Sequence, residues 1–178
     1  MPAGRWFPPF EGQTRETRRR RLFVCLGVFV LSLVTMGLLW PPSPGGVVDF
    51  ELAGDEGAAA FLDAWTGSDG ARAALAVLAD FPFLLAYGFG VALLLDAAAR
   101  WTPGDRGRFL ARGAWVPLAA AAFDVLENLC LLVVISGRTE TWPDLAESFA
   151  SVKFVLIYAV VPVVVVVDLV SAALARRR

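Results

Sequence analysis

Asp124, Glu127 and Asn128 place two carboxylates and an amide inside the apolar stretch AAFDVLENLCLLV, which covers residues 121–133. On a helix, side chains at positions i, i+3 and i+4 project from the same face. A charged side chain that faces lipid at the centre of a bilayer costs roughly 2.5–3.5 kcal/mol on insertion scales. We therefore predict that this face points into a helical bundle or a hydrated cavity, where the two acids can bind a proton, an ion or an amine.

Three further polar side chains, Asp80, Tyr87 and Lys153, lie within other apolar blocks. From the rise of about 1.5 Å per helical residue, Asp80 and Lys153 are expected about 8 and 6 Å below the outer surface. Asp80 is therefore the expected partner of Lys153, and Glu127, reached through the long lysine stem, is the second alternative. Tyr87 follows Asp80 by two helical turns, and its hydroxyl could donate to Asp124 or Glu127.

The six candidate binding residues would form two layers beneath a pocket that opens to the outer side. The upper layer is Asp80 with Lys153, and the lower layer is Tyr87, Asp124, Glu127 and Asn128. The expected membrane spans hold five acids and one lysine. Because unpaired charges are costly in apolar surroundings, we predict that at least one carboxyl group near the midplane is protonated at neutral pH.

Simpler structural roles are open for the same residues. Lys153 could extend its ammonium group to the outer surface. Asn128 and Tyr87 could serve only as interhelical hydrogen-bonding groups. For Asp124 with Glu127 a functional role is favoured, because two acids one turn apart at the midplane are costly if they only pack helices together.

The composition is that of a membrane protein. The chain is 57% hydrophobic and 19% charged, with a mean hydropathy of +0.63, whereas soluble domains are about 45–50% apolar and about 25% charged. A helix needs about 20 residues to cross about 30 Å of hydrocarbon. Four blocks have this length, and we predict transmembrane helices over residues 22–40, 74–97, 114–136 and 149–170. The expected fold class is all-α, a four-helix antiparallel transmembrane bundle.

Basic residues are concentrated in alternate segments outside these spans. Segments 1–21, 98–113 and 171–178 hold 13 of the 16 Lys and Arg residues. The positive-inside rule then places both termini in the cytoplasm. Asp96 and Asp168, beside arginines at the cytoplasmic ends of spans, are interpreted as interfacial. The expected organisation is a basic cytoplasmic lead-in (1–21), a four-span membrane domain (22–170) and a basic cytoplasmic tail (171–178).

The first outer connection is the longest. Its segment DEGAAAFLDAWT, residues 55–66, opens with acids and groups Phe61, Leu62 and Trp65 at helical spacing. This pattern favours a short amphipathic helix on the outer leaflet, with the tryptophan at the interface. A polar loop with scattered apolar residues is an equally open alternative.

The cysteine and histidine content excludes several chemistries. There is no histidine, which excludes His-ligated haem and His-based metal sites. Cys25 and Cys130 are expected too far apart to bridge, and no C-x-x-C motif is present, which argues against thiol–disulfide exchange. We expect no metal and no cofactor. The run Arg18–Arg21 is interpreted as a topology signal and not as a nucleic-acid-binding surface.

Several short motifs resemble those of a family of small four-span bacterial integral membrane proteins with no known activity. The motifs are FELA (Phe50–Ala53) followed by Trp65, then Asp80, DVLEN (Asp124–Asn128) and Lys153. They extend from Phe50 to Lys153. The resemblance implies a multi-pass protein of the bacterial inner membrane and supports the choice of site residues, but it implies no chemistry.

Three classes of function remain open. The main hypothesis is a polytopic membrane protein whose outward-facing polar pocket binds or moves a small ligand, an ion or a lipid head group. The first alternative is an accessory or assembly subunit whose buried polar groups only fix helix packing. The second is a membrane enzyme acting on a lipid head group, with Asp124 or Glu127 as general acid or base and Lys153 holding a phosphate or oxyanion. Since four spans form a narrow bundle, transport would need a homodimer. The lipid bilayer is the expected partner, and the sequence identifies neither the ligand nor a protein partner.

Overall fold

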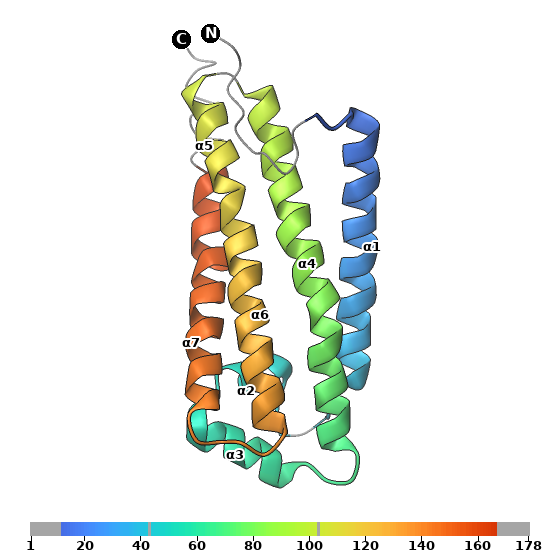
Figure 1. Ribbon diagram of the computed structural model, residues 1–178, viewed down its shortest axis with the longest axis vertical. Coiled ribbons are helices and arrows are strands. Elements are labelled where there is room, and N and C mark those ends of the chain that lie inside the picture. The colour runs from blue at the N-terminus through green and yellow to red at the C-terminus, as the bar shows by residue number, and fades with distance from the viewer. Residues whose placement is uncertain (1–11, 43, 103, 167–178) are drawn as a thin grey trace.

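The protein is an elongated all-α structure in the computed structural model, which describes residues 12–42, 44–102 and 104–166 (Figure 1). In chain order the helices are α1 (Arg15–Leu39), α2 (Val47–Glu51), α3 (Gly54–Ala64), α4 (Asp69–Trp101), α5 (Asp105–Gly113), α6 (Trp115–Ile135) and α7 (Trp142–Val155). Only Ala114 separates α5 from α6. Beyond α7 the chain continues through a π-helical turn, Leu156–Val160, into a helical segment that reaches Val166. Pro162, which lacks an N–H, follows that turn and interrupts the helical hydrogen-bond ladder.

Four of these helical stretches are long and apolar enough to cross a membrane, by length and composition. They are Arg15–Leu39, Asp69–Trp101, Asp105–Ile135 and Trp142–Val166. Each overlaps one expected span and begins before it, because polar residues start the helix ahead of the apolar block. Asp69–Trp101 also extends past the end of its span. The expected end of the fourth span at residue 170, Asp168, the basic tail 171–178 and residues 1–11 of the lead-in lie outside the described residues.

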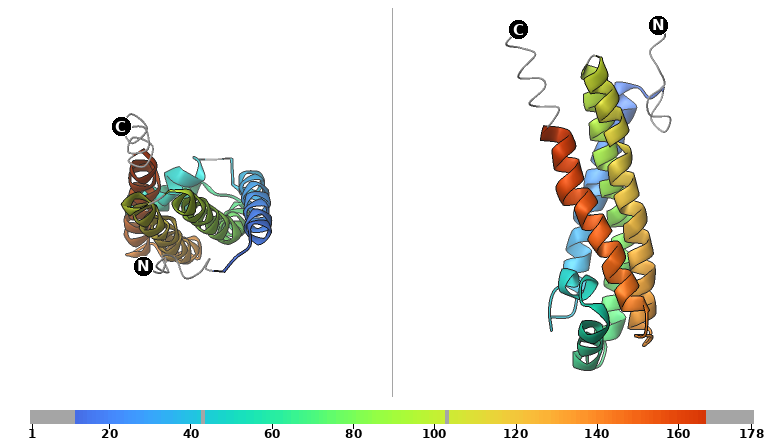
Figure 2. Two further views of the ribbon diagram at one scale, coloured as in Figure 1. Left: turned by 90° about the horizontal axis from the view of Figure 1, so that it is seen from above. Right: turned by 90° about the vertical axis from the view of Figure 1, so that its left-hand side faces the viewer.

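Successive long helices run in opposite directions and pack together, as Figure 1 shows. α1 packs along α4, α4 against α6, and α6 against α7. Seen from above, α4 lies between α1 and α6 (Figure 2). Small side chains permit the close approach of α4 and α6, since a Cβ added at Gly88 would lie 2.8 Å from the Cβ of Ala121.

α1 is the outer helix of this arrangement. All of its residues are described, and Ser32 alone among them is buried. Large apolar side chains such as Leu31 and Leu38 are 68% and 73% exposed. In a helix of this length and composition, such side chains are suited to contact with lipid.

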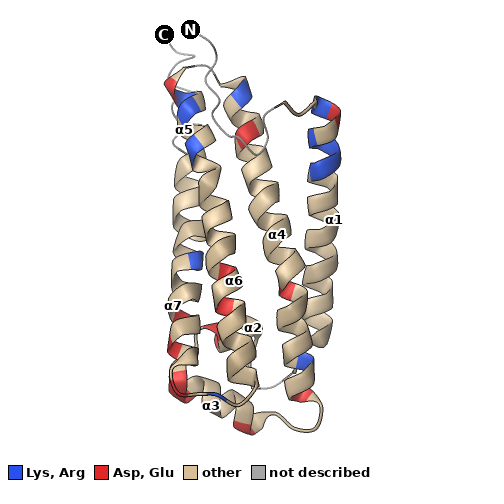
Figure 3. Ribbon diagram, viewed as in Figure 1, with Lys and Arg blue, Asp and Glu red and all other residues tan. Residues whose placement is uncertain are grey.

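The charged residues of the long helices separate into two groups along the bundle (Figure 3). Arginines gather at the end where α1 begins and α4 ends. There the buried Asp96 carboxylate accepts a hydrogen bond from Arg100 Nε at 2.9 Å and lies 3.9 Å from Arg18 Nη2. Asp96 is thus an ion-pair residue at the basic end of the bundle, in line with its interfacial interpretation.

The first long connection folds back against the other end of the bundle. α2 and α3 both contact α7, and an aromatic cluster holds them to the chain on either side. Phe50 of α2 lies 5.7, 5.2 and 5.2 Å from the ring centroids of Trp40, Phe61 and Trp65. The segment expected to form a helix at 55–66 is helical over Gly54–Ala64; its location on a membrane surface stays a prediction. This packing fixes the position of Glu51, the next residue after Phe50.

Candidate functional site

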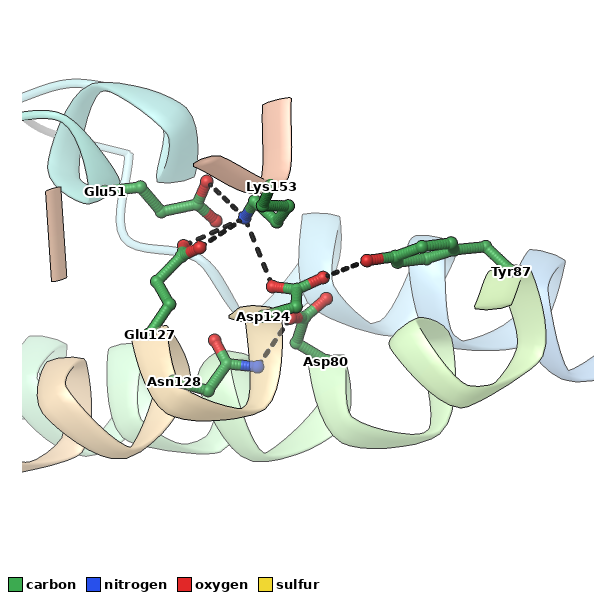
Figure 4. A network of polar contacts seen from close by, with 7 residues as sticks. All are labelled: Glu51, Asp80, Tyr87, Asp124, Glu127, Asn128 and Lys153. Atoms are coloured by element: carbon green, nitrogen blue, oxygen red, sulfur yellow. Dashed lines mark hydrogen bonds and ion pairs between the residues drawn. The ribbon is translucent and has the colours of Figure 1, made fainter. Parts of the chain in front are cut away.

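Lys153 of α7 is the centre of a buried polar network (Figure 4). Its Nζ lies 3.2 Å from Glu51 Oε2, 3.2 Å from Asp124 Oδ1 and 2.9 Å from Glu127 Oε1. The three carboxylates come from α2 and α6, so one ammonium group joins three helices. Lys153 is only 5% exposed, and the alternative in which its ammonium group extends to the surface is therefore wrong.

The face of α6 that carries the DVLEN motif points inward, as predicted from its spacing. Asp124, Glu127 and Asn128 are 2%, 0% and 1% exposed. Their neighbours Leu126 and Leu129, on other faces of the helix, are 43% and 50% exposed. The helical period thus separates a polar buried face from an apolar outer face, the reverse of the usual arrangement in a soluble protein.

The expected pairing of Lys153 with Asp80 is wrong. Asp80 Oδ2 instead accepts a hydrogen bond from Asn128 Nδ2 at 2.6 Å, and Lys153 bonds to Glu127, the second alternative, and to Asp124. The two expected layers are therefore not separate, because each residue of the upper layer bonds to a residue of the lower one. The prediction matched Asp80 and Lys153 by depth and by side-chain direction, but α4 packs against α6 and not primarily against α7. The four-carbon lysine stem reaches the deeper carboxylates of its own neighbour, α6.

Tyr87 extends the network along α4. Its hydroxyl donates to Asp124 Oδ2 at 2.9 Å, which confirms one of the two acceptors expected for it. Asp124 therefore accepts from Lys153 with one oxygen and from Tyr87 with the other. An anionic carboxylate held by two donors from two different helices has a fixed orientation.

Glu51 is the network residue that sequence analysis missed. It lies within the FELA motif but is not among the six candidate binding residues. It is 7% exposed and bonds to Lys153. Burial raises the pKa of Glu51, and the nearby ammonium group of Lys153 opposes this shift. An acid beside an aromatic residue in a five-residue helix has no periodicity that would mark it as buried. Its place in the FELA motif was the signal that could have identified it.

The network has more acids than bases. Four carboxylates, from Glu51, Asp80, Asp124 and Glu127, lie around one ammonium group. Glu127 Oε2 lies 2.7 Å from Lys153 Nζ, but it has no partner with hydrogen-bond geometry.

Neither a metal-ligand cluster nor a disulfide is present among the described residues. Within residues 12–42, 44–102 and 104–166, no group of three or more Cys, Asp or Glu side chains could hold a metal ion. Cys25 and Cys130 are both free thiols. The network can instead exchange protons among carboxylates, a lysine and a phenol, which are groups that carry out general acid–base transfer when they are within hydrogen-bonding distance.

Access to the network is restricted. Its four acids and its lysine are at most 7% exposed, and α2 carries Glu51 over Lys153 from the connection between α1 and α3 (Figure 4). An opening to the outer side therefore stays a prediction, and it would require α2 to move. Tyr87 also lines an apolar groove between α1 and α4.

The fold and the site together define a class: a small polytopic membrane protein with a buried network of charged side chains. No family model matches the chain, and neither a curated protein nor a solved structure does. Membership of the family that the motifs resemble therefore stays a prediction.

Proposed function

We propose that the network is a proton-binding centre, and that a proton taken up or released there accompanies the binding or movement of an ion or small ligand across or within the membrane. The observation that carries this proposal is the ratio of four buried carboxylates to one ammonium group. Fully ionised, the cluster would hold a large excess of negative charge where charge is costly. A bound proton removes part of that excess, and its exchange is the simplest chemistry for these groups.

The same charge balance supports a cationic ligand over an anionic one. Lys153 already contacts three carboxylates, so its charge is more than compensated. A phosphate or other anion would meet Glu51, Asp124 and Glu127 before it met an available donor. A lipid phosphate at Lys153, or an oxyanion stabilised there by catalysis, is thus poorly supported, whereas a proton or an organic cation such as an amine is better supported.

We also propose an orientation and an entry side. The arginines at one end of the bundle support a cytoplasmic location for the start of α1, the end of α4 and α5. α2 and α3 would then lie on the outer side of a bacterial inner membrane. Protons would reach Lys153 from that side past Glu51, and a homodimer would supply any wider pathway.

Infrared spectroscopy of the protein in lipid vesicles tests the proposal, because the C=O stretch separates protonated carboxyl groups from carboxylates. We expect a carboxylic-acid band at neutral pH that changes in intensity as the pH is stepped from alkaline to acid. The band should shrink in Asp124→Asn or Glu127→Gln. Asp63→Asn, which removes an exposed acid of α3, should leave it unchanged. A carboxylic-acid band that appears only at the acid pH where exposed Asp and Glu side chains are protonated would refute a proton-binding centre.

A purely structural role is the second candidate, and one observation favours it. Apart from Glu127 Oε2, the network side chains hydrogen-bond to one another across α2, α4, α6 and α7, as expected if they only fix helix packing. In that case the carboxylic-acid band would be present but would not change with pH. Variants at Asp124 and Glu127 would then lose thermal stability, and any cellular function lost would be lost through unfolding.

A further inference from the structure

Two apolar grooves flank the contact between α1 and α4. One has a volume of about 460 Å³ and the other about 670 Å³. Cys25 of α1 and Ala86 of α4 line both grooves, so the helices touch along a narrow ridge. A Cβ added at Gly90 would lie only 3.4 Å from the Cβ of Cys25. The small residues at this ridge leave room on either side for a chain-like ligand.

The smaller groove has a defined polarity. Its walls are apolar side chains such as Leu22 and Leu26 of α1 and Leu94 of α4, with Arg19 and Tyr87 as its polar residues. Because α1 and α4 run in opposite directions, Arg19 lies at the end near Leu94. Phe29, stacked on Phe83 with centroids 4.7 Å apart, lies at the end near Tyr87. The groove therefore has a basic mouth and an aromatic end.

The length of this groove corresponds to one leaflet of a bilayer. Arg19 and Phe29 are ten residues apart, which is about 15 Å along a helix. A hydrocarbon core is about 30 Å thick, so about 15 Å takes a chain from the head-group level to the midplane. Ligand-binding pockets commonly have volumes of about 300–1,000 Å³, and 460 Å³ lies in that range.

We propose that this groove binds an anionic phospholipid, with one acyl chain between α1 and α4 and the phosphate beside Arg19. Charge complementarity selects this occupant: Arg19 is exposed at the mouth and belongs to the run Arg18–Arg21. Clusters of basic side chains at the cytoplasmic end of a span attract anionic lipids. The guanidinium carbon of Arg19 lies 5.5 Å from the centroid of the Phe23 ring on the same helix, which places the charge over the apolar wall.

The end of the groove meets the polar network at one side chain. The Tyr87 ring forms part of the groove wall, and its hydroxyl donates to Asp124. A lipid chain packed against this ring would hold the hydroxyl on Asp124. The lipid site stands on the groove geometry and charge alone, so it does not depend on the proton-binding proposal.

Native mass spectrometry of the purified protein with added phosphatidylglycerol or phosphatidylcholine tests the site. Phosphatidylglycerol should form more adducts than phosphatidylcholine, and Arg19→Gln should lower that preference by about fivefold, the expected contribution of one basic residue. Arg20→Gln is the matched control, because Arg20 is adjacent, carries the same charge and lines the other groove. Equal losses in the two variants would show diffuse surface attraction and would overturn the site.

A groove-filling variant tests where the acyl chain lies. Leu26→Trp should reduce adducts of both lipids, whereas Leu31→Trp, on an exposed position of α1 that lines neither groove, should not. Unchanged adducts in Leu26→Trp would overturn the placement of the chain. Lipid adducts are counted without reference to carboxyl protonation, so failure here leaves the infrared test of the network unaffected.

Discussion

The side chains of Glu51 and Lys153 are 102 residues apart in sequence and meet at 3.2 Å between Oε2 and Nζ. This contact joins the connection after the first span to the fourth span. Because Lys153 also holds two acids of α6, the connection containing α2 is part of the network and not a passive linker. Movement of α2 would change the charge balance around Lys153 directly.

Replacing Lys153 with methionine removes the one base of the network. Three buried carboxylates would lose their partner, and we expect a loss of stability of about 3–5 kcal/mol. Thermal unfolding in detergent measures it. Arg138→Met is the control, because it removes an exposed positive charge from a loop. The double variant Lys153→Met with Glu127→Gln should recover part of the lost stability, because one of the unpaired buried carboxylates is removed. If Lys153→Met unfolded at the wild-type temperature, the stabilising role of Lys153 in the network would be contradicted.

Glu51→Gln tests the effect of burial on an acid outside the spans. Burial raises the pKa of Glu51 above its usual value of 4.5, so the folded state binds more protons than the unfolded state. The stability from this group is complete below that value and is lost as the pH rises through the raised pKa. The unfolding temperature of Glu51→Gln should therefore increase relative to wild type as the pH rises. Glu56→Gln, at an exposed position of α3, should show no such trend. The opposite trend, in which the unfolding temperature of the wild type rises relative to Glu51→Gln as the pH rises, would contradict the raised pKa of Glu51.

Tyr87→Phe removes the hydroxyl that donates to Asp124. A hydrogen bond to a charged group is worth about 1.5–3 kcal/mol, and we expect a loss of that size because Asp124 Oδ2 is left without its donor. Chemical or thermal unfolding in detergent gives the value. Tyr158→Phe is the matched control: Tyr158 is 72% exposed, and its substitution should change stability by less than about 0.5 kcal/mol. Similar losses in the two variants would mean that the hydroxyl–carboxylate bond contributes little.

Asp55→Asn tests the contact between α3 and α7. Local desolvation and the neighbouring Asp144 carboxylate raise the pKa of Asp55 above 3.8, so its ionisation at neutral pH weakens this contact. The asparagine variant should unfold at a slightly higher temperature than wild type at neutral pH. The difference should disappear at acid pH, where Asp55 is protonated. The substitution keeps the backbone N–H of residue 55, which donates to Asp144 Oδ1 at 3.2 Å in the wild type. Asp63→Asn on the same helix is the control, and its unfolding temperature should not show the pH-dependent difference.

Much of this architecture follows from local sequence patterns. The number and approximate limits of the long helices could be predicted because hydrocarbon thickness requires about 20 apolar residues per span. The inward direction of Asp124, Glu127 and Asn128 followed from the helical period and from the cost of exposing charge to lipid. These properties depend on residues close together in the chain, so no knowledge of neighbouring helices was needed.

The partners of each polar group were decided by tertiary packing. Depth and side-chain direction matched Asp80 with Lys153. The order in which the helices pack instead pairs Asp80 with Asn128, and Lys153 with the acids of α6. Glu51 entered the network because aromatic contacts of Phe50 hold α2 against the bundle. Contacts between elements distant in the chain depend on which faces meet and how far each side chain reaches. Neither quantity is encoded in the periodicity of a single helix.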